Sequence, residues 1–83
     1  MRNAYIEVKT EANSCQKVAA ALRNMPGIKD ADALFGDVDV MAVAEVSDDS
    51  ADYLDELEAL IESVKELSGV VTTVTRPVKS RED

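Results

Sequence analysis

The stretch MPGIKDADALFGDVDVMAVAEV, residues 25–46, contains two predicted strands in direct succession. Residues 28–34 alternate weakly and carry three charges, a pattern typical of an edge strand whose charges discourage unwanted pairing. After Phe35 and Gly36, residues 38–46 are apolar on nearly both faces, which is typical of an interior strand. The stretch therefore predicts an edge strand followed at once by an interior one.

One strand and one helix are predicted on each side of this pair. Residues 4–10 alternate as a half-buried strand, and residues 15–25 carry apolar positions at helical spacing behind a predicted Asn13 cap. Residues 53–67 form a second amphipathic stripe, and VVTTVT at 70–75 has the composition of a strand. MPGI at 25–28 and LSGV at 67–70 occupy the same place in the two strand–helix–strand halves.

The element order β-α-β-β-α-β predicts an α+β fold of the ferredoxin-like type. We expect one domain over residues 1–78 and a disordered polar tail over residues 79–83. Right-handed crossovers would place both helices on one face of a four-stranded antiparallel sheet. The other face has no cover within the chain, so we expect two copies to pair there as a dimeric α/β barrel. Tyr5, Met41 and Val43 are predicted to line that dimer interface.

Seventeen acidic and nine basic residues give the chain a net charge of −8. This charge argues against direct binding of nucleic acid, which requires Lys and Arg to displace counterions from phosphates, and against an anionic membrane. The N-terminus lacks the apolar core of a signal peptide and no apolar run approaches a membrane span, so a cytoplasmic protein is expected.

The side chains available for chemistry are few. Histidine and tryptophan are absent and Cys15 is the single cysteine. This composition removes the commonest general base, any internal disulfide and any paired-cysteine metal site. We therefore expect no metal, no cofactor and no enzymatic activity.

The segment Gly36-Asp37-Val38-Asp39, in register with a downstream Gly69-Val70 and Thr75, is similar to one known family. From Ala4 to about Val78, the chain resembles the effector-binding domain of the Lrp/AsnC transcription regulators, also called the RAM domain. The position occupied by Val38 is often aromatic in that family. Full-length members carry an N-terminal helix-turn-helix domain, whereas the first strand begins at once here, so the chain resembles the stand-alone form.

This resemblance implies a small-molecule effector, often an amino acid, bound between subunits. In that role Gly36 would let the backbone approach the ligand closely. Carboxylates would accept an ammonium group, hydroxyls would add contacts, and an arginine or backbone amides would meet a carboxylate. The ligand-binding residues expected on this basis are Gly36, Asp37, Asp39, Thr73, Thr75 and Arg76. The partners implied are a homodimer, a higher homo-oligomer such as an octamer or decamer, and a full-length Lrp/AsnC regulator.

Other interpretations stay open at the level of sequence. Gly36-Asp37 is also an ordinary turn dipeptide, Asp39 could bond backbone amides of its own hairpin, and the threonines could be plain strand formers. The chain could be a purely structural oligomerisation module, or a small dimeric ferredoxin-like enzyme despite its lack of histidine. An ACT-type amino-acid-binding domain shares the strand order, but its ligand loop would fall at residues 10–14, which contain no glycine.

Overall fold

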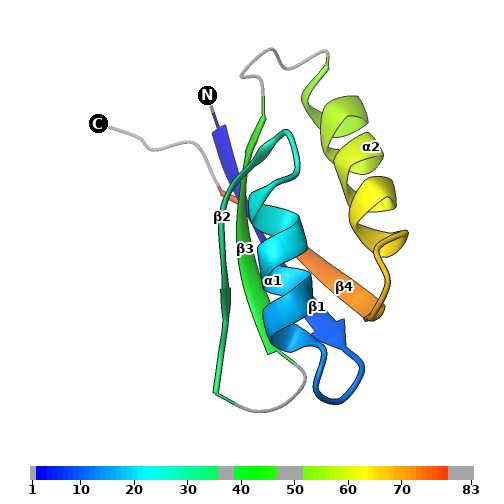
Figure 1. Cartoon of the computed structure of the whole chain (residues 1–83). Helices are drawn as coiled ribbons and strands as arrows, with labels where there is room; N and C mark the ends of the chain where they lie inside the picture. The colour runs from blue at the N-terminus through cyan, green and yellow to red at the C-terminus, as the bar shows by residue number, and fades with distance from the viewer. Residues whose placement is uncertain (1, 36–38, 47–51, 79–83) are drawn as a thin grey trace.

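The computed structural model describes residues 2–35, 39–46 and 52–78, and these contain six regular elements. In chain order they are β1 (Arg2–Thr10), α1 (Cys15–Arg23), β2 (Ile28–Ala33), β3 (Asp39–Val46), α2 (Tyr53–Lys65) and β4 (Val70–Pro77) (Figure 1). The predicted β-α-β-β-α-β order and the ferredoxin-like fold class are confirmed. The expected tail at 79–83 lies outside the described residues.

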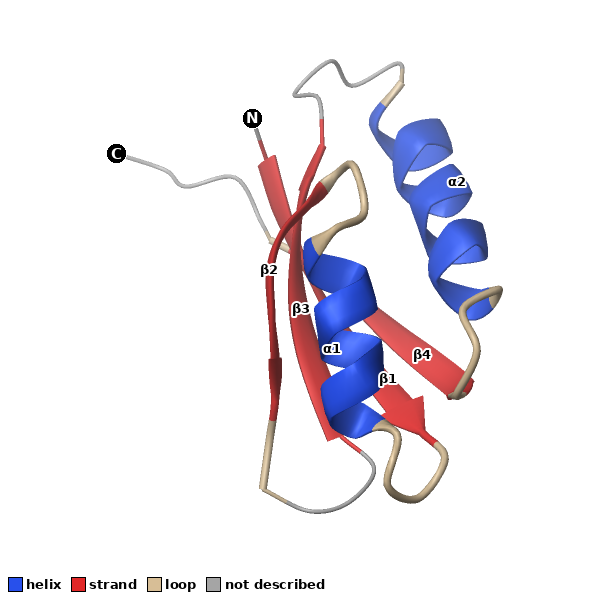
Figure 2. Ribbon diagram, in the orientation of Figure 1, coloured by secondary structure: helices blue, strands red, loops and turns tan. Residues whose placement is uncertain are grey.

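The four strands form one antiparallel sheet in the order β2-β3-β1-β4. The charged strand β2 is an edge strand and the apolar strand β3 is an interior one, as the sequence predicts. Both helices lie on the same side of the sheet (Figure 2), with α1 against β2 and β3 and α2 against β4 and β3. The helices therefore cover one face of the sheet only.

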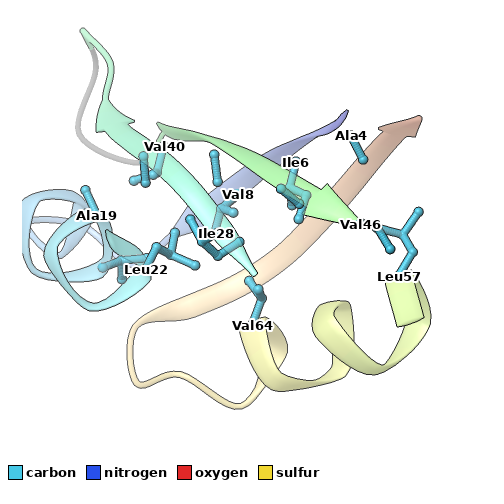
Figure 3. Packing of buried hydrophobic residues seen from close by; sticks show 14 of the residues in the cluster. Ala4, Ile6, Val8, Ala19, Leu22, Ile28, Val40, Val46, Leu57 and Val64 are labelled. Atoms are coloured by element: carbon cyan, nitrogen blue, oxygen red, sulfur yellow. The ribbon is translucent and has the colours of Figure 1, made fainter. Parts of the chain in front are cut away.

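The hydrophobic core lies between the sheet and the two helices. The fifteen buried apolar residues of the described chain come from β1, β2 and β3 and from the inner stripes of the helices, and Figure 3 draws most of them. The small side chains of Ala42 and Ala44 in β3 and Ala4 in β1 leave room for the helices to pack onto the sheet. The cluster consists of Ala4, Ile6, Val8, Val18, Ala19, Leu22, Ile28, Ala31, Val40, Ala42, Ala44, Val46, Tyr53, Leu57 and Val64.

The face of the sheet opposite the helices, called the open face here, carries the other side chain of each alternating pair. Tyr5 is 44% exposed on this face, and its ladder partner Val43 is half-buried. Met41 pairs with Glu7, two residues further along the same two strands and on the same face. The three residues predicted for the dimer interface thus lie together on the open face.

The two similar segments, MPGI at 25–28 and LSGV at 67–70, fold into the same turn. The amide of Ile28 donates to the carbonyl of Met25 at 3.1 Å, and the amide of Val70 donates to the carbonyl of Leu67 at 3.2 Å. The glycine in each turn has a left-handed backbone, with φ of 92° at Gly27 and 94° at Gly69. Residues with a Cβ rarely adopt this conformation, which explains why glycine occupies the equivalent place in both halves.

Alanine substitution at these two glycines is expected to have unequal effects. Gly27→Ala should destabilise the protein by about 1–2 kcal/mol, because alanine is strained in the left-handed backbone conformation. Its new Cβ would meet only Leu60, at an ordinary contact distance of 3.4 Å. Gly69→Ala should cost about 1 kcal/mol more, because its Cβ would lie 3.1 Å from Ser14 Cβ and 3.2 Å from Val18 Cγ2. Urea denaturation of both variants tests this order, and equal losses would contradict the tight packing at Gly69.

The start of α1 differs from the prediction. The N-cap residue is Ser14 rather than Asn13, and it makes no side-chain capping hydrogen bond. Asn13 instead adopts a left-handed turn conformation with φ of 65°, which asparagine tolerates better than most residues. The Asn13 cap prediction is wrong because the local turn after β1 takes up this residue before the helix begins.

Candidate functional site

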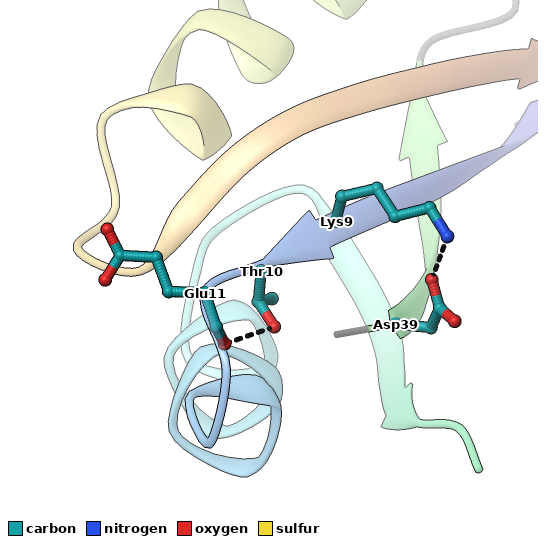
Figure 4. Close-up of polar contacts among 4 residues, drawn as sticks. All are labelled: Lys9, Thr10, Glu11 and Asp39. Atoms are coloured by element: carbon teal, nitrogen blue, oxygen red, sulfur yellow. Dashed lines mark hydrogen bonds and ion pairs between the residues drawn. The ribbon is translucent and has the colours of Figure 1, made fainter. Parts of the chain in front are cut away.

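The candidate site begins with an ion pair at one end of the open face. Asp39 is the first residue of β3 and lies opposite Lys9 of β1 in the ladder. The Lys9 ammonium donates a hydrogen bond to Oδ1 of Asp39 (Figure 4). The main-chain oxygen of Asp39 accepts the amide of Leu34 at 2.9 Å, so the backbone of this residue is fixed against the end of β2.

Both charges of this pair remain accessible to a ligand. The side chain of Lys9 is 53% exposed and that of Asp39 is 34% exposed. The hydrogen bond to Asp39 and then the charge of Asp39 raise the pKa of Lys9 above its ordinary value of 10.5, and Glu7 adds to the effect. A raised lysine pKa stabilises the folded state below pH 10.5, and this contribution is lost as the pH rises through the folded-state pKa. Lys9 is therefore fully charged near neutral pH.

A hollow of about 210 Å³ adjoins the pair. Its lining comes from both interior strands and from the end of β2, so the hollow opens on the open face. Pockets that hold drug-sized ligands measure about 300–1,000 Å³, so this one fits a small ligand or requires a second subunit to enlarge it. The lining residues are Glu7, Lys9, Leu34, Asp39, Val40 and Met41.

The residues predicted for ligand binding do not all meet in one subunit. Thr73 and Thr75 pair with Val8 and Ile6, whose side chains face the helices, so both threonines point away from the open face. Arg76 of β4 pairs with Tyr5 and lies on the open face. Tyr5 is four residues before Lys9 along β1, so Arg76 is distant from the Lys9–Asp39 pair in the sheet. Gly36 and Asp37 lie outside the described residues.

Lys9, Glu7 and Leu34 line the same hollow as Asp39, and none of these three was predicted as a ligand-binding residue. The alternation of residues 4–10 puts Glu7 and Lys9 on the outward face of β1 together with Tyr5. That periodicity gives the face but not the register, and only the register sets Lys9 opposite Asp39. Among the described residues, the cation that pairs with Asp39 is therefore Lys9.

Other surfaces of the described chain offer less. A larger hollow of about 490 Å³ runs along α2 alone, and half of its lining residues are acidic: it is lined by Asp55, Glu58, Ala59, Ile61, Glu62 and Lys65. The described residues contain no group of three or more His, Cys, Asp or Glu that could hold a metal ion. No helix in the described ranges is long and apolar enough to cross a bilayer.

Three solved structures are similar to this chain. The hypothetical protein PHS023 from Pyrococcus horikoshii is 26% identical, with a TM-score of 0.73 over 98% of this chain and 93% of the other. The protein FFRP-DM1 is also 26% identical, with a TM-score of 0.72 over 95% of this chain and 100% of that one. TTHA0845 from Thermus thermophilus, at 20% identity, matches 100% of this chain and 99% of its own with a TM-score of 0.76 and supports the fold alone.

A search of the curated proteins finds no match. The family model for the Lrp/AsnC ligand binding domain, in contrast, matches residues 3–82, which is almost the entire 83-residue sequence. This match covers all six elements described above except the first residue of β1, and it agrees with the resemblance carried by the Gly36–Asp39 segment and the Gly69-Val70 turn. The chain belongs to the Lrp/AsnC ligand-binding domain family.

Proposed function

We propose that this protein is a non-catalytic regulatory domain that binds an amino acid at a junction between subunits and passes the signal to a partner regulator of the same family. The observation that carries the proposal is the Lys9–Asp39 pair beside a small hollow on the open face. Family membership supplies the regulatory setting. A cytoplasmic location, where such a regulator would meet free amino acids, follows from this role.

The charge pattern of the pair suits a zwitterion. The carboxylate of Asp39 would accept hydrogen bonds from the α-ammonium group of an amino acid, and the Lys9 ammonium would donate to its α-carboxylate. Exposed ion pairs contribute little net stability, so a ligand can replace each partner by its own opposite charge at small cost. Met41 and Leu34 on the hollow wall would contact an apolar part of the ligand.

Homodimer formation through the open face is the second part of the proposal. A small domain with one uncovered sheet face gains buried area by pairing with another copy. Tyr5, Met41 and Val43 give this face an apolar centre. Phe35, fully exposed beyond the end of β2, would provide a separate apolar contact through which dimers assemble into an octamer or decamer.

An amino-acid screen by thermal unfolding tests the sensing role. A ligand present at about ten times its Kd stabilises the folded protein by about 1.4 kcal/mol. For a domain of this size that gain corresponds to a rise in Tm of about 6–11 °C. We expect at least one of the twenty amino acids to produce such a rise, and a flat response across all twenty would remove the sensor claim.

Two variants locate the ligand. Asp39→Asn and Lys9→Met should abolish the rise in Tm while leaving the fold intact, since both side chains are partly exposed. Asp32→Asn is the matched control, because Asp32 lies exposed on the same face but on strand β2 and outside the hollow. A dimer that persists with no response to any amino acid would favour the purely structural oligomerisation module.

A further inference from the structure

The hollow beside the Lys9–Asp39 pair contains a second carboxylate, that of Glu7, which takes no part in the pair. Residues paired across the strands form rows on the open face, and two successive rows build this hollow. Lys9 and Asp39 belong to one row, and Glu7 and Met41 belong to the next. Among the described residues, the Glu7 carboxylate has no ion-pair or hydrogen-bond partner.

The neighbours of Glu7 within its row are apolar. Met41 lies opposite Glu7 on β3, and Val74 lies opposite it on β4. Lys9 lies two residues further along β1 on the same face, but its ammonium is already bonded to Asp39. Glu7 is close enough to raise the pKa of Lys9, an effect to which Asp39 contributes most. A half-buried carboxylate between apolar side chains favours a cation as its partner.

The charges of the hollow do not balance. Two of its three charged residues, Glu7 and Asp39, are acidic, Lys9 is basic, and the remaining lining residues are apolar. The charges of Asp39 and Lys9 complement the α-ammonium and the α-carboxylate of an amino acid. The charge of Glu7 then has its complement only in a ligand that carries a further positive charge.

We infer that the ligand of this site is an amino acid with a cationic side chain, whose terminal nitrogen binds to Glu7. This inference rests on the proposed function and assigns the class of ligand for the same site. The α-ammonium of the ligand binds to Asp39, its α-carboxylate binds to Lys9, and its methylene groups contact Met41. A neutral or acidic amino acid leaves the Glu7 carboxylate covered without a partner, which is unfavourable.

The spacing of the two rows fits a side chain of about three or four methylene groups. Residues two apart on an antiparallel strand are separated by about 7 Å, which is the distance between the rows of Lys9 and Glu7. An extended side chain of this kind spans roughly 5–6 Å from its Cα atom to its terminal nitrogen. A charge-assisted hydrogen bond of about 2.8 Å then reaches the carboxylate. Ornithine and lysine meet this requirement, whereas 2,3-diaminopropionate is too short.

Titration calorimetry with L-lysine and L-norleucine tests the inference, because norleucine is lysine without its terminal ammonium group. We expect lysine to bind about fivefold more tightly, the upper range for an exposed ion pair. Glu7→Gln should raise the Kd of lysine about fivefold and leave that of norleucine within about twofold, so that the preference disappears. L-Ornithine should bind as lysine does, and 2,3-diaminopropionate should bind more weakly than either.

Two controls separate recognition at this hollow from general attraction between a cation and an acidic protein. Glu58→Gln makes the same substitution at an exposed position of α2, in the layer on the other side of the sheet. It should leave both dissociation constants within about twofold, since distant surface charges are largely screened at physiological salt. Cadaverine, which is lysine without its α-carboxylate, lacks the group that binds to Lys9 and should bind about tenfold more weakly than lysine.

The outcomes separate this inference from the function on which it rests. If none of the amino acids binds, the proposed sensing role fails and the inference fails with it. If norleucine binds as tightly as lysine, or if Glu7→Gln keeps the preference for lysine, the sensing role stands and the cationic ligand is overturned. Equal binding of cadaverine and lysine also overturns the inference, because the cation would then bind without the contacts to Lys9 and Asp39.

Discussion

Leu57→Ala is expected to lower the free energy of unfolding by about 2–5 kcal/mol, the usual cost of truncating a buried leucine. Leu57 is 4% exposed and belongs to the same buried cluster as Val46 at the end of β3 (Figure 3). Truncating its side chain leaves a cavity between α2 and the sheet that the surrounding side chains fill only in part. Urea denaturation at a fixed protein concentration measures the loss, since any dimer makes apparent stability depend on concentration.

Leu54 offers a control on the same helix. It lies three residues before Leu57 and is 63% exposed, so Leu54→Ala removes the same atoms from a position in contact with solvent. Its expected effect is below about 0.5 kcal/mol, as for most surface substitutions. Similar losses for the two variants would mean that α2 presents a different face to the sheet.

For the dimer proposed above, Val43→Asp is expected to raise the dissociation constant by about a hundredfold or more. Val43 lies at the centre of the open face, between Tyr5 and Asp30 in its row. A carboxylate there would be buried without a partner when a second copy covers the face, and a desolvated unpaired charge costs several kcal/mol. Sedimentation equilibrium reads the Kd, and circular dichroism checks that the separated subunits keep their secondary structure.

Ala59→Asp provides the matched control for the added charge. Ala59 lies exposed on α2, in the helical layer on the opposite side of the sheet from Val43. The same carboxylate introduced there should leave the Kd within about twofold, since distant surface charges are largely screened at physiological salt. An unchanged Kd in Val43→Asp itself would mean that copies associate through another surface.

The glycine turns and the strand periodicities were accessible from the sequence because they depend on local chemistry. Gly27 and Gly69 adopt the same left-handed backbone, which only glycine adopts freely, so the repeated segment marks the same turn in both halves. The charges of β2 and the two-sided apolar pattern of β3 identified an edge strand and an interior strand correctly. The start of α1 was missed because Asn13 suits both a helix cap and a left-handed turn.

The composition of the candidate site was less accessible. Asp39 was identified because a carboxylate on a largely apolar strand requires a partner, and the structure supplies Lys9. Thr73 and Thr75 were grouped with it on chemistry, but alternation along β4 places them on the helix side of the sheet. Arg76 does lie on the open face, in the row of Tyr5 and Val43 rather than in that of Asp39.

By itself, the sequence determined the order of the elements, the edge and interior strands and the uncovered face, because each depends on periodicity and turn chemistry within a few residues. Only the tertiary structure decided which residues of that face lie next to one another. A pairing register joins residues far apart in the chain, such as Lys9 and Asp39, and alternation restricts which face each side chain occupies without fixing its partner. The proposed ligand pair follows from that register.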